Sequence, residues 1–419
     1  MNVTVTALGA VIALVIAITL IIKKVNPAYG LILGALIGGL VGGAGLTGTV
    51  NLMMDGAKNM MPAILRILTA GVLAGVLIES GAAAKIAETI VEKIGESRAL
   101  IALAIATMVL TMVGVFVDVS VITVSPIALA IAHKSGLSKP AILLAMVGGG
   151  KAGNIMSPNP NTIAAADNLG VSLTNVMIAG IVPAIFGVII TCILASRIKQ
   201  KGSLVESDEH MKELTDMPGF LPAMVGPLVA IILLMLRPIA GIAIDPLIAL
   251  PVGGVCGILA MGKIKHINKY ATYGLAKMSG VAILLIGTGT LAGIIANSGL
   301  KDVIISGINA LGLPSFMLAP VSGILMSAAT ASTTSGTAVA TSVFGPTIVQ
   351  LGVAPLATAA MIHAGATVLD HLPHGSFFHA TGGSVSMDMK ERLKLIPYES
   401  LVGLTMTIVS TIIFGIILK

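Results

Sequence analysis

Apolar runs long enough to cross a bilayer recur along almost the whole chain, and they limit what it can fold into. Residues 3–22 and 396–418 are two examples, one near each end. A helix of about 20 apolar residues matches the hydrocarbon thickness of a bilayer. Because 56% of the 419 residues are hydrophobic and only 10% are charged, the sequence predicts an all-α polytopic membrane protein.

The run at residues 3–22 has no basic segment before it and no small-residue cleavage site after it, so we expect a retained helix. The two cysteines, Cys192 and Cys256, fall inside predicted spans, which argues against a disulfide or a cysteine metal site. The net charge of +6 lies mostly in short loops. It therefore indicates membrane orientation rather than nucleic-acid binding.

Lysine and arginine divide unequally between two alternating sets of loops. The larger set holds Lys23, Lys24, Lys85, Lys93, Arg98, Arg197, Lys199, Lys201, Lys212, Lys263, Lys265, Lys269, Lys390, Arg392 and Lys394. The other set holds little more than Lys58, Arg237 and Lys301. By the positive-inside rule the larger set is cytoplasmic, which predicts a multi-pass protein of the bacterial cytoplasmic membrane with both termini outside.

The two halves of the chain resemble each other. "LAGVLIESG" (73–81) and "LAGIIANSG" (291–299) agree at five of nine positions, and an amphipathic stretch follows each. The loop charges place these stretches on opposite sides of the membrane, as in an inverted-topology repeat. We therefore predict about ten transmembrane helices in two repeats, 1–199 and 219–419, joined by a cytoplasmic linker at 200–218.

Each repeat is predicted to contain a re-entrant hairpin and a broken helix. Both ends of the stretch 98–134 are basic, so both are expected in the cytoplasm with a polar tip between them; its counterpart is 313–351. The broken helices are expected at 139–168 and 354–382. Unpaired backbone inside a bilayer is tolerated only against protein or a wet cavity. The two tips and two breaks are therefore expected to meet at one substrate site near the midplane.

Small polar side chains mark the first break and the second tip. The candidate substrate-binding residues are Asn154, Ser157, Asn159, Asn161, Thr162, Ser332, Thr333, Thr334, Ser335, Gly336 and Thr337, with His371 and His374 from the second break. Two other roles remain open. The break residues can cap the half-helices, and the serines and threonines can hydrogen-bond backbone within packed helices.

Ionisable residues deep in apolar stretches are candidates for proton coupling. Lys151 could attract a carboxylate, and Asp118 could carry a proton, because burial raises a carboxylate's proton affinity. A purely structural Asp118–Lys151 pair is the alternative. Arg66 falls in the first turn of its span, where we expect it to snorkel to the outer surface.

The stretch "DHLPHGSFFHATGG" (370–383) gathers Asp370, His371, His374 and His379. Imidazole titrates near neutral pH, so Asp370, His371 and His379 are further proton-coupling candidates. A structural polar cluster that braces the break is an open alternative. Proline and glycine interrupt the segment, so no helical face presents ligands, and we predict no metal site.

The same stretch, with "GGGKAGNIMSPNPNTIAAAD" (148–167) and "SAATASTTSGTAVA" (327–340), resembles the gluconate:proton symporter family of permeases over nearly the whole chain. That family belongs to a superfamily of ion-coupled carboxylate carriers with paired re-entrant hairpins. The resemblance implies secondary active uptake of small organic anions, usually with protons. It also suggests a homodimer. The glycine-rich stretch 35–45 permits close helix packing, either within one protomer or between two.

The function predicted from these features is import of a small hydroxy-acid or sugar-acid anion by proton symport with alternating access. We expect no enzyme activity and no cofactor beyond the coupling ion, H⁺. The alternatives are a sodium-coupled carboxylate symporter and a sodium/proton antiporter, since Asn, Ser, Thr and free carbonyls at helix breaks also coordinate Na⁺. An intramembrane hydrolase is disfavoured because no G-x-S-x-G setting is present.

Overall fold

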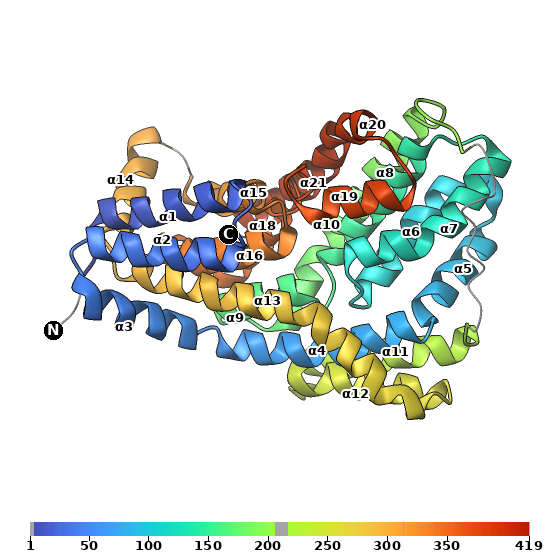
Figure 1. The fold of residues 1–419 in the computed structure, drawn as a ribbon, viewed down its shortest axis with the longest axis horizontal. Helices are drawn as coiled ribbons and strands as arrows, with labels where there is room; N and C mark the ends of the chain where they lie inside the picture. The colour runs from blue at the N-terminus through green and yellow to red at the C-terminus, as the bar shows by residue number, and fades with distance from the viewer. Residues whose placement is uncertain (1–3, 206–216, 313, 419) are drawn as a thin grey trace.

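The computed structural model describes residues 4–205, 217–312 and 314–418, and these form helices with two isolated β-bridges and no strand (Figure 1). The predicted all-α fold is therefore confirmed for this part of the chain. Six of its helical segments are long and apolar enough to cross a membrane: Met61–Glu79, Val117–Ser135, Leu173–Arg197, Phe220–Ala240, Ile264–Ala296 and Met389–Ile417. Shorter apolar helices accompany them. The expected total of about ten spans stays a prediction.

One group of helices is built around the long helix α13 (Ile267–Ala296). The helices of this group are α1 (Ala7–Ile22), α2 (Pro27–Val41), α3 (Gly45–Lys58), α4 (Met61–Glu79), α11 (Phe220–Ala240), α12 (Pro246–Ala260) and α13. Helix α13 packs along α2, α3 and α4, while α1 pairs with α2 and α11 pairs with α12 (Figure 1).

Glycines set the close packing inside this group. A side chain on Gly71 would meet the backbone of Gly274, so these positions let α4 and α13 approach closely. Within the predicted glycine-rich stretch 35–45, Gly38 lies against Ala13 of α1 and Gly39 against Thr49 of α3. These two glycines therefore serve packing inside one protomer.

The remaining helices form a second group. Its first-half members are α5 (Ala82–Ile94), α6 (Ala99–Met112), α7 (Val117–Ser135), α8 (Lys139–Asn154), α9 (Pro160–Leu169) and α10 (Leu173–Arg197). Its second-half members are α15 (Leu318–Thr330), α16 (Thr333–Val343), α17 (Gly345–Gln350), α18 (Pro355–Gly365), α19 (Ser376–Ser384), α20 (Met389–Lys394) and α21 (Ile396–Thr411), with α14 (Leu300–Leu311) beside α1. Short helical turns η1 (Glu96–Arg98), η3 (Ile264–His266), η4 (Ser315–Met317) and η5 (Ile412–Ile417) complete the described elements.

Two pairs of helices and two helix breaks bring the halves together. Helix α6 packs on α7, and α15 packs on α16 across a turn at residues 331–332. The breaks separate α8 from α9 and α18 from α19. Helix α16 then contacts α9, while α19 contacts α7, so each pair reaches the broken helix of the other half. The re-entrant course of the pairs, the inverted repeat and the side of the membrane that each end faces stay predictions, and most of the linker (206–216) lies outside the described residues.

Candidate functional site

A cavity of 180 Å³ lies where the two helix pairs meet the two breaks. Four helices, α7, α9, α16 and α19, contribute residues at or next to their N-terminal ends. The lining residues are Phe116, Val117, Asp118, Asn154, Asn161, Ala331, Ser332, Thr333, Thr334, Asp370, Ser376 and Phe377. The structure thus brings together the four segments that the sequence predicted to form one site.

The helix ends at the cavity favour the binding of a negatively charged ligand. Each N-terminus carries a partial positive charge and backbone N–H groups without partners inside the helix. At α9 and α16, side chains of Asn159 and Ser332 accept hydrogen bonds from those N–H groups. At α7 the residue before the helix provides no cap, but Asp118 in the first turn accepts a hydrogen bond from the Val119 N–H. At α19 no side chain caps the first turn, so N–H groups of this helix are left without side-chain caps beside the cavity, an arrangement suited to binding an anion.

Residues of the first break divide between capping and lining. The Asn159 side-chain oxygen accepts from the backbone N–H of Asn161 (3.0 Å) and Thr162 (3.1 Å), and the Thr162 hydroxyl donates to the same oxygen. Asn159 and Thr162 therefore serve as caps. Asn154 and Asn161 line the cavity. Ser157 is buried without a hydrogen-bond partner among the described residues and is not part of the lining.

At the second tip, only the first three predicted residues, 332–334, face the cavity. The Thr334 hydroxyl donates to the Asn161 side-chain oxygen over 2.5 Å and so ties the tip to the first break. Ala331, before them, has a left-handed backbone (φ +46°), which is strained for alanine. Ser335, Gly336 and Thr337 are buried behind the lining. Gly336 packs against the backbone of Ser327, which leaves no room for a side chain.

Lys151 of α8 is buried and fully paired. Its Nζ lies 2.6 Å from Asp370 Oδ1, 2.8 Å from His371 Nδ1 and 2.8 Å from the Thr367 carbonyl oxygen. An ammonium has three N–H donors, so all three are satisfied. The structural alternative of an Asp118–Lys151 pair is therefore wrong, because Asp370, on the other break, takes the place of Asp118.

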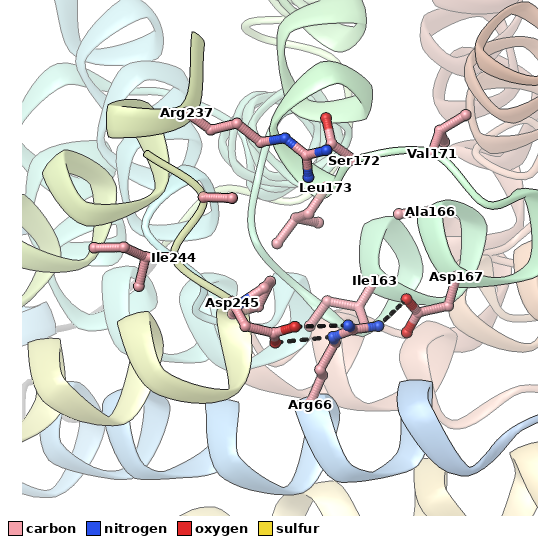
Figure 2. Close-up of a pocket in the computed structure, with 12 residues that line it drawn as sticks. Arg66, Ile163, Ala166, Asp167, Val171, Ser172, Leu173, Arg237, Ile244 and Asp245 are labelled. Carbon is pink, nitrogen blue, oxygen red and sulfur yellow. Dashed lines mark hydrogen bonds and ion pairs between the residues drawn. The ribbon is translucent and has the colours of Figure 1, made fainter. Parts of the chain in front are cut away.

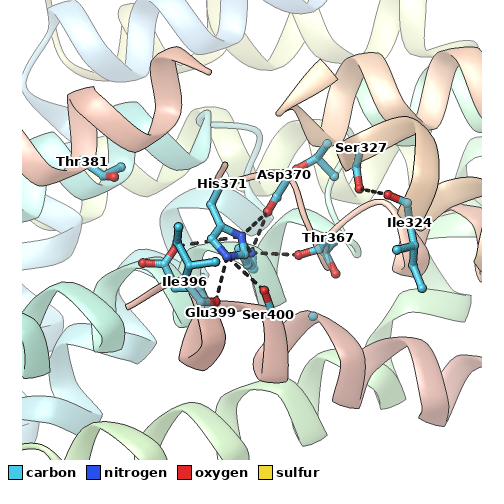
Figure 3. A network of polar contacts seen from close by, with 12 residues as sticks. Ile324, Ser327, Thr367, Asp370, His371, Thr381, Ile396, Glu399 and Ser400 are labelled. Atoms are coloured by element: carbon cyan, nitrogen blue, oxygen red, sulfur yellow. Dashed lines mark hydrogen bonds and ion pairs between the residues drawn. The ribbon is translucent and has the colours of Figure 1, made fainter. Parts of the chain in front are cut away.

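The buried ionic network continues behind the cavity through His371 (Figure 3). Its Nε2 lies 3.1 Å from the Ile396 carbonyl oxygen and 3.3 Å from the Ser400 hydroxyl, and its Nδ1 lies 4.0 Å from Glu399 Oε2. Glu399 in turn forms an ion pair with Arg392. The network holds two cations and two carboxylates beside one histidine, so it is neutral when the imidazole is neutral.

Sequence reasoning missed Glu399 and assigned Arg392 to a cytoplasmic loop. Arg392 is instead 2% exposed, donates to the Phe378 carbonyl oxygen and the Thr381 hydroxyl, and lies over the Phe378 ring. A carboxylate near the start of the apolar run 396–418 was the available signal, because ionisable groups in such runs are usually functional.

Asp118 is the second carboxylate that lines the cavity. It is half-buried, and its Oδ1 accepts a hydrogen bond from the Val119 N–H over 2.9 Å. Within the described ranges no cation is paired with it, whereas Asp370 is neutralised by Lys151 and accepts from the Thr333 hydroxyl (2.5 Å). The two carboxylates of the cavity are thus in different electrostatic environments.

His374 and His379, the remaining predicted histidines of the second break, are not part of the cavity lining. His374 Nε2 is 3.3 Å from the Ala329 carbonyl oxygen, and the exposed His379 has its Nε2 2.8 Å from the Pro373 carbonyl oxygen. Both therefore brace the second break in this conformation. In the part of the chain that the structure describes, no three histidine, cysteine or carboxylate side chains are placed to hold a metal ion.

Arg66 does not snorkel, which corrects the expectation for it. Its guanidinium binds both carboxylate oxygens of Asp245 (3.0 and 2.7 Å) and forms an ion pair with Asp167 of α9 (Figure 2). These three residues, the Arg66 cluster, line a second cavity of 160 Å³ together with the side chain of Arg237. A partner on a neighbouring helix satisfies the arginine more fully than interfacial water would.

The GntP family permease model matches residues 1–417. The chain belongs to the GntP family of permeases. A transporter of Haemophilus influenzae without an assigned function is 67% identical over 99% of both chains. A gluconate permease of Bacillus licheniformis is 24% identical over 90% of this chain and 91% of its own length. A high-affinity gluconate transporter of Escherichia coli is 22% identical over 93% and 95%. The relatives are permeases, so this protein is a membrane transporter and not an enzyme.

One solved structure has a related fold. The YdaH transporter of Alcanivorax borkumensis superposes with a TM-score of 0.62 and 15% identity, covering 87% of each chain. At this identity the likeness shows the fold alone. It supports the helical transporter architecture and leaves the solute to be argued from the site.

Proposed function

We propose that this protein imports a small sugar-acid or hydroxy-acid anion, with gluconate as the first candidate, by proton symport with alternating access. The observation that carries the proposal is the cavity itself. Four helix ends and several hydroxyl and amide side chains surround it, and it contains one neutralised and one unneutralised carboxylate. No other described cavity combines these features.

The lining suits a polyhydroxylated carboxylate. The first-turn N–H groups of α19 are placed to receive the carboxylate. Hydroxyl and amide groups of Ser332, Thr334 and Asn154 are placed to bond sugar hydroxyls. A cavity of this size accommodates a small acid rather than a drug-sized ligand. Two of the relatives are named as gluconate carriers, which agrees with this chemistry.

Asp118 provides the coupling between the anion and the proton. Two negative charges about 4 Å apart repel by about 4 kcal/mol at an effective dielectric of about 20. Protonated Asp118 would remove this repulsion, so the substrate anion and the proton favour each other's binding. One proton also makes the transport of a monoanion electrically neutral, which avoids about 2.3 kcal/mol per 100 mV of opposing potential.

His371 is the second proton-handling group in this proposal. Its Nε2 faces the Ile396 carbonyl oxygen, so the neutral ring carries its hydrogen there and its Nδ1 accepts from Lys151. A proton on Nδ1 would instead donate to Asp370 Oδ1, 3.0 Å away. Protonation would therefore loosen the contact between α8 and the second break, next to the cavity.

Alternating access would move the α6–α10 and α15–α21 group against the group around α13. The exchanged packing of α16 on α9 and of α19 on α7 supports two related halves, as the inverted repeat requires. Both breaks and both turns lie within the moving group in this scheme. Movement would thus carry the whole cavity from one side to the other.

Purified protein in liposomes that contain a pH dye tests this function. Gluconate, hydroxybutyrate, lactate, citrate and D-serine are added outside, with and without sodium. Saturable internal acidification that requires one organic anion and ignores sodium is the expected result. Acidification by no solute at all would overturn proton symport.

The variant Asp118→Asn tests the coupling residue. We expect it to keep solute exchange between equal pools but to lose acidification and uphill uptake. Asp55→Asn is the matched control, because the Asp55 side chain is 69% exposed and pairs only with Lys58 on the surface. Acidification at the normal rate in Asp118→Asn would remove Asp118 from this role.

Sodium coupling is the second candidate. The buried hydroxyl groups of Ser157, at the first break, and Thr337, in α16, have no hydrogen-bond partner among the described residues. Oxygen atoms at helix breaks are typical sodium ligands in transporters. Uptake driven by a sodium gradient without acidification would favour this reading, and a proton flux driven by sodium without solute would indicate an antiporter.

A further inference from the structure

A cavity of 490 Å³ lies at the opposite end of α7 from the predicted substrate site, and its lining shares no residue with that site. It is formed where α6 begins and where α7 and α10 end. All three elements join loops that the positive-inside rule assigns to the cytoplasm. With that orientation, the cavity is expected at the level of the cytoplasmic lipid headgroups, where membrane helices meet water.

Two cations and several small polar groups line this cavity. Arg98 and Lys199 are exposed, and their side chains make no ion pair or hydrogen bond with the described residues. The one carboxylate in the lining, Glu96, is 3.5 Å from Lys134. The hydroxyls of Ser97, Ser135 and Ser196 provide further hydrogen-bond donors. The lining therefore presents unneutralised positive charge.

The backbone adds to this positive field. Helix α6 begins in the cavity wall with Ala99, Leu100 and Ile101; the Ala99 N–H donates to the Glu96 carbonyl oxygen, and no side chain caps this helix end. Phosphate oxygens are typical ligands for uncapped helix N-termini next to arginine. Arg98, Lys199 and the start of α6 line the same cavity, and each of them favours a phosphate group.

An apolar surface leads from the cavity along the membrane-facing side. Ile101 on α6 is 40% exposed, and Ile193 and Ile189 on α10 are 43% and 50% exposed. Ile189, Ile193 and Ser196 follow one another at spacings of four and three residues, so they share a face of α10 that ends at the cavity. A free phosphate ion would not contact this apolar surface, whereas the acyl chain of a lipid would cover it.

We propose that this cavity binds the phosphate headgroup of an anionic phospholipid, with Arg98 and Lys199 as its two charged ligands and the Ile189–Ile193 face holding an acyl chain. Basic pockets between membrane helices on the cytoplasmic side bind anionic lipid headgroups through the same chemistry. The proposal does not depend on which solute the protein carries.

Binding is tested with the full-length protein in detergent by native mass spectrometry during titration with phosphatidylglycerol or phosphatidylcholine. We expect phosphatidylglycerol to bind about 30-fold more weakly to the double variant Arg98→Gln/Lys199→Gln, at about fivefold per charge removed, with little change for phosphatidylcholine. Lys23→Gln/Lys265→Gln is the control, because it removes two exposed cations from predicted cytoplasmic loops elsewhere.

Equal loss in both double variants, or none in either, would overturn the proposal. In a second experiment, inorganic phosphate is added to the protein–lipid complex. At millimolar concentration it is expected not to displace the lipid. Displacement would assign the cavity to a soluble anion. A folding check by size-exclusion chromatography accompanies each variant. If Arg98→Gln/Lys199→Gln does not fold, the single variants Arg98→Gln and Lys199→Gln are titrated separately, and unchanged lipid affinity in both would equally refute the site.

Discussion

Two ionic clusters of this transporter contain similar residues in contrasting environments. In the buried network, the side chains of Lys151, Asp370 and Arg392 are 1%, 6% and 2% exposed. In the Arg66 cluster, the side chains of Arg66, Asp167 and Asp245 are 26%, 17% and 40% exposed. The buried network balances two cations with two carboxylates, whereas Arg66 is shared by two carboxylates.

Because of this difference in burial, the loss of one charged residue is expected to affect stability differently in the two clusters. A buried ion that loses its partner keeps its full desolvation penalty, which costs about 3–5 kcal/mol. Exposed pairs contribute about 0–1 kcal/mol, because water and salt replace the partner. The buried network is therefore expected to fix the conformation around the cavity, while the Arg66 cluster can open and close at small cost.

Lys151→Met is expected to have the largest effect. It leaves Asp370 buried without a cation, so we expect unfolding to become easier by about 3–5 kcal/mol and uptake to be lost. Lys139→Met on the same helix is the control, because Lys139 is only half-buried and donates to a single carbonyl oxygen. Thermal unfolding in detergent measures the change. The double variant Lys151→Met/Asp370→Leu should recover much of the stability without recovering uptake.

Glu399→Gln is expected to destabilise the protein less than Lys151→Met. Arg392 loses its ionic partner but keeps its bonds to Phe378 and Thr381 and its contact with the aromatic ring. We expect a loss of about 2–3 kcal/mol, with solute binding retained because Glu399 does not line the cavity. Unfolding with and without gluconate measures both. Loss of binding in a folded variant would place Glu399 in the substrate site.

The contrast also shows what sequence reasoning can and cannot reach. Apolar runs and helix-breaking residues are local signals, so the helical fold and the meeting of four polar segments were predictable. Pairing is not local: Arg66 binds Asp167 and Asp245 across 101 and 179 positions. Lys151 finds Asp370 across the two halves for the same reason. Charge counting placed Arg392 in a loop because it ignores how α20 folds back onto Glu399.

Arg66→Gln is expected to cost about 1 kcal/mol, at the upper end for partly exposed pairs. We also expect this variant to take up solute more slowly, because Asp167 lies on α9, whose first turn lines the cavity. Lys58→Gln is the control, since the Lys58–Asp55 pair is about 70% exposed on both sides. Uptake rates in liposomes compare the two. Equal rates in both variants would show that the Arg66 cluster has no part in transport.

The smallest effect is expected from acid at Asp245, and it is the difference between the wild type and Asp245→Asn. The hydrogen bonds from Arg66 hold the pKa of the Asp245 carboxyl below its usual range. A carboxyl with a depressed folded-state pKa contributes stability above its unfolded pKa of about 3.9, and this contribution is lost as the pH falls through the folded-state pKa. The wild type should therefore lose a small increment of stability below about pH 4 that Asp245→Asn lacks. Unfolding temperatures of the two proteins are measured from pH 3 to pH 6. Parallel curves would mean that the Arg66–Asp245 ion pair contributes no measurable stability. Its exposure to water already limits that contribution to a small value.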